Sequence, residues 1–203
     1  MMKVALIGAS GNAGSRILAE LTRRGHHVTA IARHAEKIPA GPNVTAQQGD
    51  VFDGKGLADL LEGHDAIISS VHFTASDPDI LIAAVRASGV RRYLVVGGAG
   101  SLDVAPGVAL VTTPDFPQIY KEEATKGFDF LKKLRGIVDL DWTFLSPSAL
   151  FIPGERTGQF RLGKDDLLTN DKGSSISFED YAIALVDELE KPAHIRQRFT
   201  VGY

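Results

Sequence analysis

Three glycines, spaced three residues apart, constrain this chain more than any other feature of its sequence. The apolar run from Lys3 to Ile7 predicts a strand, and the turn Gly8-Ala9-Ser10-Gly11-Asn12-Ala13-Gly14 follows it directly. Apolar residues at helical spacing then predict a helix over residues 12–24, ended by Gly25. A strand, a tight glycine turn and a helix are the phosphate-binding unit of dinucleotide-binding folds.

The glycines of this turn have separate physical roles. The first allows a sharp turn, the second lets the backbone approach a pyrophosphate, and the third lets the helix pack closely on the strand. The helix N-terminus offers free N–H groups and a partial positive charge to the anion. A purely structural turn is the alternative, but the strand before it and the helix after it favour dinucleotide binding. The residues expected to contact the dinucleotide here are Gly8, Ser10, Gly11, Asn12, Ala13 and Gly14.

The rest of the chain alternates apolar runs with amphipathic segments. Strands are predicted over 27–32, 44–48, 65–71, 92–96 and 141–146, and helices over 56–63, 80–88, 119–135 and 177–190. Apolar strands separated by helices indicate a parallel sheet covered on both faces. The sequence therefore predicts an α/β fold: a doubly wound parallel sheet of the Rossmann type, strand order 3-2-1-4-5-6, formed by residues 1–203 as a single domain. Residues 199–201 are expected to add a closing edge strand.

Two segments interrupt this alternation. Residues 99–118 are rich in Pro, Gly and Thr and predict a substrate loop or lid, with a tolerated insertion as the alternative. Residues 147–176 contain few periodic apolar positions and predict a small C-terminal extension that covers the substrate.

Composition excludes several other classes of function. The 22 basic and 25 acidic residues are scattered, so we expect no nucleic-acid or membrane partner. The absence of cysteine excludes thiolate metal sites and cysteine nucleophiles. The six histidines show no paired ligand spacing beyond His26-His27, so no metal site is predicted. No export signal or apolar stretch of about 20 residues is present, and a cytoplasmic monomer or homodimer is expected.

The residue that ends the second predicted strand indicates which dinucleotide is bound. NAD binders usually place an acid there for the ribose hydroxyls, whereas this chain has Arg33. A guanidinium offers a 2′-phosphate a forked, permanently charged donor, so Arg33 favours NADPH, with NADH possible and a merely solvated charge as the alternative. After the third strand, Asp50 and Val51 are candidates for contacts with adenine, although an Asp beside Gly49 is equally typical of a turn.

Small residues follow predicted strands four and five, at the edge where open α/β sheets bind their ligands. They leave room for ribose and nicotinamide, and they are Ser69, Ser70, Val71, Gly97 and Gly98. His72 lies in the same place, but a histidine after a strand is more often a structural hydrogen-bonding group than a catalytic one.

Several motifs together resemble a known group of enzymes. They are the glycine turn, Asp50-Val51, Gly97-Gly98-Ala99-Gly100, Tyr120-Lys121-Glu122-Glu123-Ala124, the run LDWTFLSP over 140–147 and the ending FTVGY over 199–203. Across essentially the whole chain, they resemble atypical short-chain dehydrogenases. Within these, the chain looks most like bacterial NADH-flavin-reductase-like proteins, which are relatives of biliverdin-IX-beta/flavin reductase and of nitrogen-metabolite-repressor-like redox sensors.

The resemblance implies an oxidoreductase, but its catalytic pattern departs from the ordinary one. Ordinary members carry a tyrosine four positions before a lysine. If Lys121 matches that lysine, the earlier position is Pro117, which has no proton to donate. Lys121, Tyr120 and Ser146 are the catalytic candidates that this leaves. Lys121 and Pro147 are also expected at the nicotinamide end of the cofactor, where Phe73, Phe116 and Phe151 are possible aromatic platforms.

This departure affects the substrate that we expect. Reduction of a simple ketone needs a positioned acid or oxyanion donor, whereas a conjugated ring spreads the added charge and accepts hydride through proximity and stacking. The predicted function is therefore NAD(P)H-dependent hydride transfer to a flavin, quinone or similar conjugated acceptor. The alternative is a non-catalytic NADP(H)-binding redox sensor that acts through a protein partner. A sugar-nucleotide epimerase would need the Tyr-x-x-x-Lys pair and a larger C-terminal domain.

Overall fold

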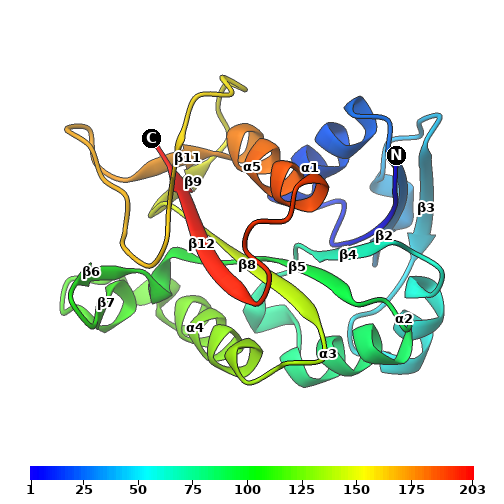
Figure 1. Ribbon diagram of the computed structural model, residues 1–203, viewed down its shortest axis with the longest axis horizontal. Helices are drawn as coiled ribbons and strands as arrows, with labels where there is room; N and C mark the ends of the chain where they lie inside the picture. Colours follow the sequence, from blue (N-terminus) through cyan, green and yellow to red (C-terminus); the bar gives the residue numbers. More distant parts are fainter.

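The chain is described here from a computed structural model that covers residues 1–203, and its centre is one eight-stranded sheet (Figure 1). The strands lie in the order β10-β12-β8-β5-β4-β1-β2-β3. Their bounds are β1 Lys3–Ile7, β2 His27–Ala32, β3 Val44–Gln48, β4 Ala66–Ser69, β5 Arg92–Val96, β8 Asp141–Pro147, β10 Arg161–Gly163 and β12 Gln197–Gly202. All neighbouring strands are parallel except β10 and β12. The predicted doubly wound Rossmann order is confirmed, because the sixth predicted strand is β8.

The end of the chain departs from the prediction. Residues 197–202 form β12, which was expected to be an edge strand. Instead β12 pairs in parallel with β8 on one side and antiparallel with β10 on the other. The edge strand is β10, a three-residue segment of the predicted extension. It was missed because so short a strand has too few residues for a periodic pattern.

Five α-helices cover the two faces of the sheet (Figure 1). They are α1 Asn12–Arg23, α2 Gly54–Leu61, α3 Pro78–Ala87, α4 Lys121–Arg135 and α5 Phe178–Glu190. Helices α1 and α5 pack against each other on one face, while α2, α3 and α4 cover the other. Each face buries its own apolar cluster, which explains why the inner strands are apolar throughout.

Side chains fix where two of these helices begin. The carboxylate of Asp77 accepts hydrogen bonds from the N–H groups of Asp79 and Ile80, with Pro78 at the first position of α3. The hydroxyl of Ser177 accepts from the N–H of Asp180 at the start of α5. Asp and Ser are typical residues at these positions, because their side chains satisfy N–H groups that the helix leaves free.

Short elements make up the two segments predicted as substrate loop and extension. The loop contains the hairpin of β6 Asp103–Ala105 and β7 Val108–Ala109, together with single turns of 3₁₀-helix. The extension contains β9 Leu150–Ile152, which pairs with β11 Ser175–Ser177 just before α5. The two segments are joined to each other, since the N–H of Asp103 donates to the carbonyl of Asp165 at 2.8 Å.

Backbone between β9 and β10 is held to the helices by carboxylates. The buried Asp180 accepts hydrogen bonds from the N–H of Gly158 at 2.8 Å and from the Thr157 hydroxyl at 2.5 Å. On α1, the buried Glu20 accepts two hydrogen bonds from the guanidinium of Arg156. The extension is therefore bonded to both α1 and α5, the two helices that share one face of the sheet. No helix is long and apolar enough to cross a bilayer; a cytoplasmic location stays a prediction.

Candidate cofactor and substrate site

The glycine turn connects β1 to α1 at the carboxyl edge of the sheet, and side chains are excluded from it at two positions. Gly8 has a φ of +83°, and a Cβ there would lie 2.1 Å from the carbonyl oxygen of Ser70. A Cβ at Gly14 would lie 2.1 Å from the carbonyl oxygen of Gly8. The turn is also tied to β2, since the N–H groups of Gly8 and Ala9 donate to the carbonyl of Ile31 at 2.8 and 3.2 Å. The glycines thus allow three strand ends and one helix to meet closely.

The start of α1 fits a pyrophosphate. Gly11 is the N-cap residue and provides no side-chain acceptor, and the N–H of Ser15 is the first to bond back to it. The preceding N–H groups of the first turn therefore remain available to an anion. Ser10 and Asn12 are exposed beside them, whereas the Ala13 side chain is buried against the core. Ala13 would thus contact a dinucleotide through its backbone.

Arg33 follows β2 directly and is exposed. No carboxylate pairs with its guanidinium; its neighbours His34 and Glu36 pair with each other at 3.1 Å. The end of β3 lies alongside, because the N–H of Gly49 donates to the carbonyl of Ala32. An uncompensated cation at this edge is suited to a phosphate on the adenosine ribose.

Asp50 and Val51 lie after β3, at the same edge. One carboxylate oxygen of Asp50 accepts a hydrogen bond from the N–H of Phe52 at 3.0 Å. Asp50 therefore has the turn-forming role that was considered for it. Because Asp50 is exposed, its carboxylate is also accessible to an adenine ring. Phe52 was not singled out from sequence, yet its ring is 56% exposed beside these two residues.

The residues after β4 and β5 separate into buried and accessible ones. Ser69 is buried, and its hydroxyl bonds to that of Tyr93 at 2.9 Å inside the sheet, so this side chain faces the core and not a ligand. Ser70 and Val71 are half-buried beside the glycine turn. After β5, a Cβ at Gly97 would collide with the Phe144 ring at 2.4 Å. The requirement for glycine there is thus set by packing, while the half-buried Gly98 borders the open edge.

The predicted catalytic residues on α4 are close together in sequence but differ in their surroundings. Lys121 is the first residue of α4, and its Nζ donates to the carbonyl of Val111 in the substrate loop. Its ammonium also lies 5.7 Å from the centre of the Phe116 ring. Tyr120, in contrast, is 60% exposed. Lys121 therefore bonds to the loop in this structure, and its ammonium has further N–H donors with which it could bond a ribose.

Ser146 and Pro147 end β8 and are both buried. The hydroxyl of Ser146 accepts a hydrogen bond from Nη1 of Arg198 at 3.4 Å. Arg198, on β12, also donates to the carbonyl of Ser101 and forms an ion pair with Asp165 at 2.6 Å. Sequence reasoning missed Arg198, because an arginine in an apolar strand has no pattern that reveals its partners. Arg198 thus joins the substrate loop, the extension and Ser146 at the end of β8.

Glu123 is a second residue that sequence reasoning missed. Its carboxylate, on the first turn of α4, accepts hydrogen bonds from the N–H groups of Phe73 and Thr74, each at 2.8 Å. It also accepts from the Thr74 hydroxyl and contacts Nδ1 of His72 at 3.2 Å. Burial alone would raise the pKa of Glu123, but these hydrogen bonds and the charge of His72 lower it below its ordinary value. A carboxylate whose ionised form is favoured therefore holds the segment that follows β4.

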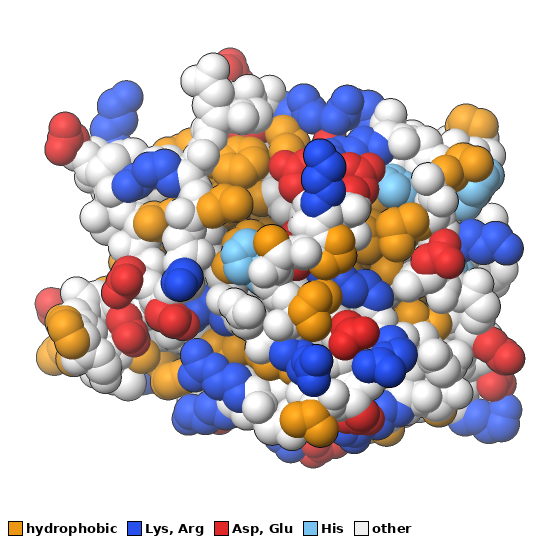
Figure 2. Space-filling model, in the orientation of Figure 1, with side chains coloured by type: hydrophobic (Ala, Val, Ile, Leu, Met, Phe, Trp, Pro, Cys, Tyr) orange, Lys and Arg blue, Asp and Glu red, His pale blue; other side chains and the backbone are white.

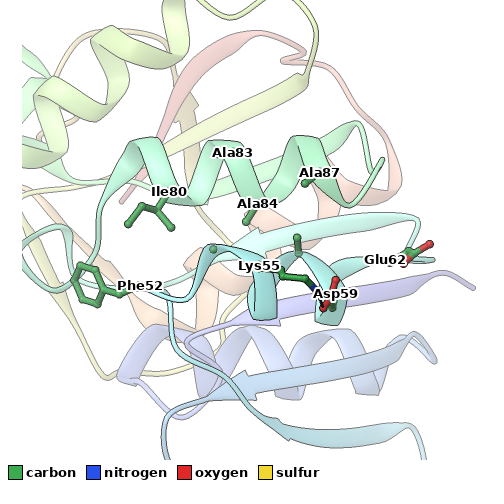
Figure 3. Close-up of a pocket in the computed structure, with 10 residues that line it drawn as sticks. Phe52, Lys55, Asp59, Glu62, Ile80, Ala83, Ala84 and Ala87 are labelled. Carbon is green, nitrogen blue, oxygen red and sulfur yellow. Dashed lines mark hydrogen bonds and ion pairs between the residues drawn. The ribbon is translucent and has the colours of Figure 1, made fainter.

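A separate hollow of about 510 Å³ lies between α2 and α3 (Figure 3). Phe52 and Ile80 lie at one end, with alanines along α3 and the charged Lys55 and Asp59 on α2. Apart from Phe52, which follows Val51, it is remote from the residues predicted to bind the dinucleotide. No group of three His, Asp or Glu side chains converges anywhere as a metal site would require.

The parallel sheet, the glycine cradle and the free helix N-terminus define a Rossmann-type NAD(P)-binding protein. Residues 8–192 match the model of a family described as NAD(P)H-binding. Because this match spans most of the sequence, the chain belongs to the NAD(P)H-binding family. Its solved neighbours are Rossmann-fold NAD(P)-binding proteins, including short-chain-dehydrogenase-like oxidoreductases, as the motifs implied.

Three similar proteins illustrate the range of names in this group. YwnB of Bacillus subtilis, an uncharacterized protein, is 43% identical and matches 98% of each chain. A Bacteroides thetaiotaomicron structure, named as a proposed epimerase, is 41% identical with a TM-score of 0.94 and covers 99% of this chain and 96% of its own. A Streptococcus pneumoniae structure, named as a proposed NADH-flavin reductase, is 40% identical with a TM-score of 0.80 and covers 100% and 99%.

Proposed function

We propose that this protein is an NADPH-dependent reductase that transfers hydride to a flavin, a quinone or a similar conjugated ring. The cofactor preference rests on Arg33, which is exposed at the end of β2 and has no acidic partner. A 2′-phosphate would supply the charge that this guanidinium lacks, and NADH offers no such group.

The observation that carries the choice of acceptor is the distribution of exposed apolar side chains. Most of the large ones lie on the substrate loop, on the short turn between it and α4, and on the extension; these segments follow β5 and β8 at one end of the sheet (Figure 1). They are Val104, Val108, Ile119, Tyr120, Leu150, Ile152 and Leu162. A flat, mostly apolar ring would bury such side chains, whereas a sugar would leave them unpaired with anything apolar.

Each part of the edge then has a distinct task. The N-terminus of α1 and the glycine turn would hold the pyrophosphate, and Gly98 would leave room for the nicotinamide against the end of β5. When bound, the dinucleotide supplies the hydride. Arg198 would keep the loop and extension in register over the acceptor, since it bonds to residues of both. The name of the pneumococcal relative is in keeping with this reaction.

The charge pattern of the surface agrees with a small ligand. On the face shown in Figure 2, basic and acidic side chains are interspersed, and a dense group of them lies over α5. Arg24, which follows α1, pairs with Asp187 and Glu190 of α5 at 2.7 Å each. No nucleic-acid or membrane partner is therefore proposed.

The decisive experiment follows NADPH oxidation by absorbance, with purified protein and FMN, FAD, a naphthoquinone or no acceptor, and with NADH in parallel. Oxidation that depends on the acceptor and favours NADPH is expected. Tight NADPH binding with no turnover on any acceptor would overturn the reductase and leave a dinucleotide-binding redox sensor.

A further inference from the structure

A histidine and a carboxylate from two different elements meet at the nicotinamide half of the edge. His72 follows β4, and Glu123 lies on the first turn of α4. Nδ1 of His72 is 3.2 Å from one carboxylate oxygen of Glu123. The His72 side chain is 84% exposed, so its other ring nitrogen, Nε2, is open to solvent.

Glu123 is itself held firmly. It accepts hydrogen bonds from two backbone N–H groups and one hydroxyl of the 72–75 segment, and that segment is packed against the end of β5. The Phe73 ring lies 3.6 Å from where a Cβ at Gly98 would be, and it stacks on Phe144 with ring centres 6.3 Å apart. The imidazole is thus held through its Nδ1 side, the arrangement by which carboxylates orient a histidine ring and select its tautomer.

The other ionisable groups nearby are already engaged. Lys121 bonds to Val111, Glu122 pairs with Lys126 at 3.1 Å, and Asp77 caps α3. Glu123 is therefore the charged side chain that contacts His72 directly.

We propose that His72 is the proton donor of the reductase reaction and that Glu123 is its positioning residue. This rests on the proposed function. The acceptor ring gains hydride from the reduced nicotinamide and a proton from Nε2 of the His72 imidazolium. The Nε2–H bond breaks as a new O–H or N–H bond forms on the ring, and neutral His72 then regains a proton from water. The tyrosine that ordinary relatives use is thus replaced by a residue from a different strand end.

Two readouts test this proposal in the full-length protein. The first is the NMR titration of the His72 ring, assigned by its loss in His72→Gln and measured without dinucleotide. In Glu123→Gln the His72 titration is expected to move to lower pH, because the neutral amide no longer favours the imidazolium. His27→Gln, a change at an exposed histidine on β2, is the matched control and should leave that curve unchanged. An unmoved curve in Glu123→Gln would overturn the coupling.

The second readout is the pH profile of acceptor-dependent NADPH oxidation. Wild-type turnover is expected to fall as pH rises across the range of about 5 to 8 in which histidines lose their charge. His72→Gln should lower turnover about 100-fold. This is the lower end of the range for general acids, because a conjugated ring can be protonated after the hydride has arrived. The variant's turnover should also no longer fall with rising pH. Its affinity for NADPH should stay within about twofold of wild type.

The outcomes separate the two proposals. Equal rates and pH profiles for wild type and His72→Gln would overturn the role of His72 alone and leave the reductase standing. An inactive wild type would overturn the reductase, and with it the proton donor. Loss of NADPH binding in His72→Gln would assign the residue to the cofactor site instead and overturn the proton transfer.

Discussion

The backbone of Gly8 leaves no room for a side chain at Gly14: a Cβ at Gly14 would lie 2.1 Å from the Gly8 carbonyl oxygen and 3.2 Å from the Cα of Ala9. Both obstacles are backbone atoms, so neither can move by changing a rotamer. The close packing of α1 on β1, and with it the position of the helix N-terminus, depends on this absent side chain.

Gly14→Ala is therefore expected to destabilise the fold by about 3 kcal/mol and to abolish tight dinucleotide binding. Thermal or urea unfolding and calorimetric titration with NADPH measure the two effects. Gly41→Ala is the control, because a Cβ there meets only the Val44 side chain at 3.4 Å. Equal stability of the two variants would contradict the packing argument.

Arg33→Ala should weaken NADPH binding by about 10- to 100-fold, the contribution of one or two charge-assisted hydrogen bonds, and leave NADH binding nearly unchanged. Titration calorimetry with both dinucleotides gives the ratio. Lys37→Ala removes an exposed cation from the same segment without removing the guanidinium at the strand end, and should have little effect. If Arg33→Ala weakens both dinucleotides equally, the assignment of the 2′-phosphate to Arg33 is wrong.

The buried carboxylate of Glu188 on α5 holds two parts of the fold. It pairs with Arg92 of β5 at 3.1 Å and with Nδ1 of His194 at 2.8 Å, and its side chain is 3% exposed. Burial lowers the pKa of Arg92, and the charge and hydrogen bond of Glu188 oppose that effect. Glu188→Ala leaves a buried guanidinium without its counter-charge, so we expect a loss of about 3 to 5 kcal/mol in the free energy of unfolding.

An exposed pair provides the comparison for Glu188. Lys55 and Asp59 form an ion pair at 2.7 Å on α2 with both side chains largely in solvent. Asp59→Ala should change stability by less than about 1 kcal/mol. Denaturant unfolding of Glu188→Ala and Asp59→Ala measures both effects. A similar loss of unfolding free energy in the two variants would show that burial does not make the Glu188 ion pair more important.

Glu20 makes the protein sensitive to acid. Its burial alone would raise the pKa, but hydrogen bonds from Arg23, Arg156 and Arg24 bring the pKa far below the ordinary 4.5. Because the folded-state pKa is depressed, its stabilising contribution is complete above about pH 4.5 and is lost as pH falls below that value.

Glu20→Gln should therefore lower the melting temperature at pH 7. Its difference from wild type should narrow as the pH is lowered toward 3, because below about pH 4.5 the unfolded wild-type chain takes up a proton at Glu20 while the folded chain keeps the carboxylate ionised. Thermal unfolding at a series of pH values gives the comparison. A difference that stays constant over this range would show that the carboxylate's charge is not what stabilises the fold.

The fold was largely predictable because its information is local. The apolar strands, the glycine turn, and the caps at Asp77 and Ser177 each follow from residues that are neighbours in sequence. The position of β12 was not predictable in the same way. Whether a final strand lies at an edge depends on a three-residue partner, β10, whose own sequence has no strand pattern.

In the candidate site, too, the features formed by neighbouring residues were predictable and the contacts between distant residues were not. Backbone contributions such as the glycine turn follow from a motif, and so does a cation at a strand end such as Arg33. Glu123 and Arg198 act on residues far away in the chain, His72 in one case and Ser101 and Asp165 in the other. A sequence read residue by residue carries no signal for such pairs, because the partners are chosen by the packing of α4 and β12. The burial of Ser69 and Ser146 was missed for the same reason.

The interior place of β12 has a consequence for how this sheet is assembled as the polypeptide is synthesised. The strands from β1 to β8 emerge first and can pair among themselves, but β8 then presents an open, apolar edge until residues 197–202 appear. During that interval, the nascent chain exposes a template on which another chain could pair. Closing that edge also brings Arg198 into place, so the late step that protects the sheet from aggregation is the same one that joins the segment after β5 to the extension after β8.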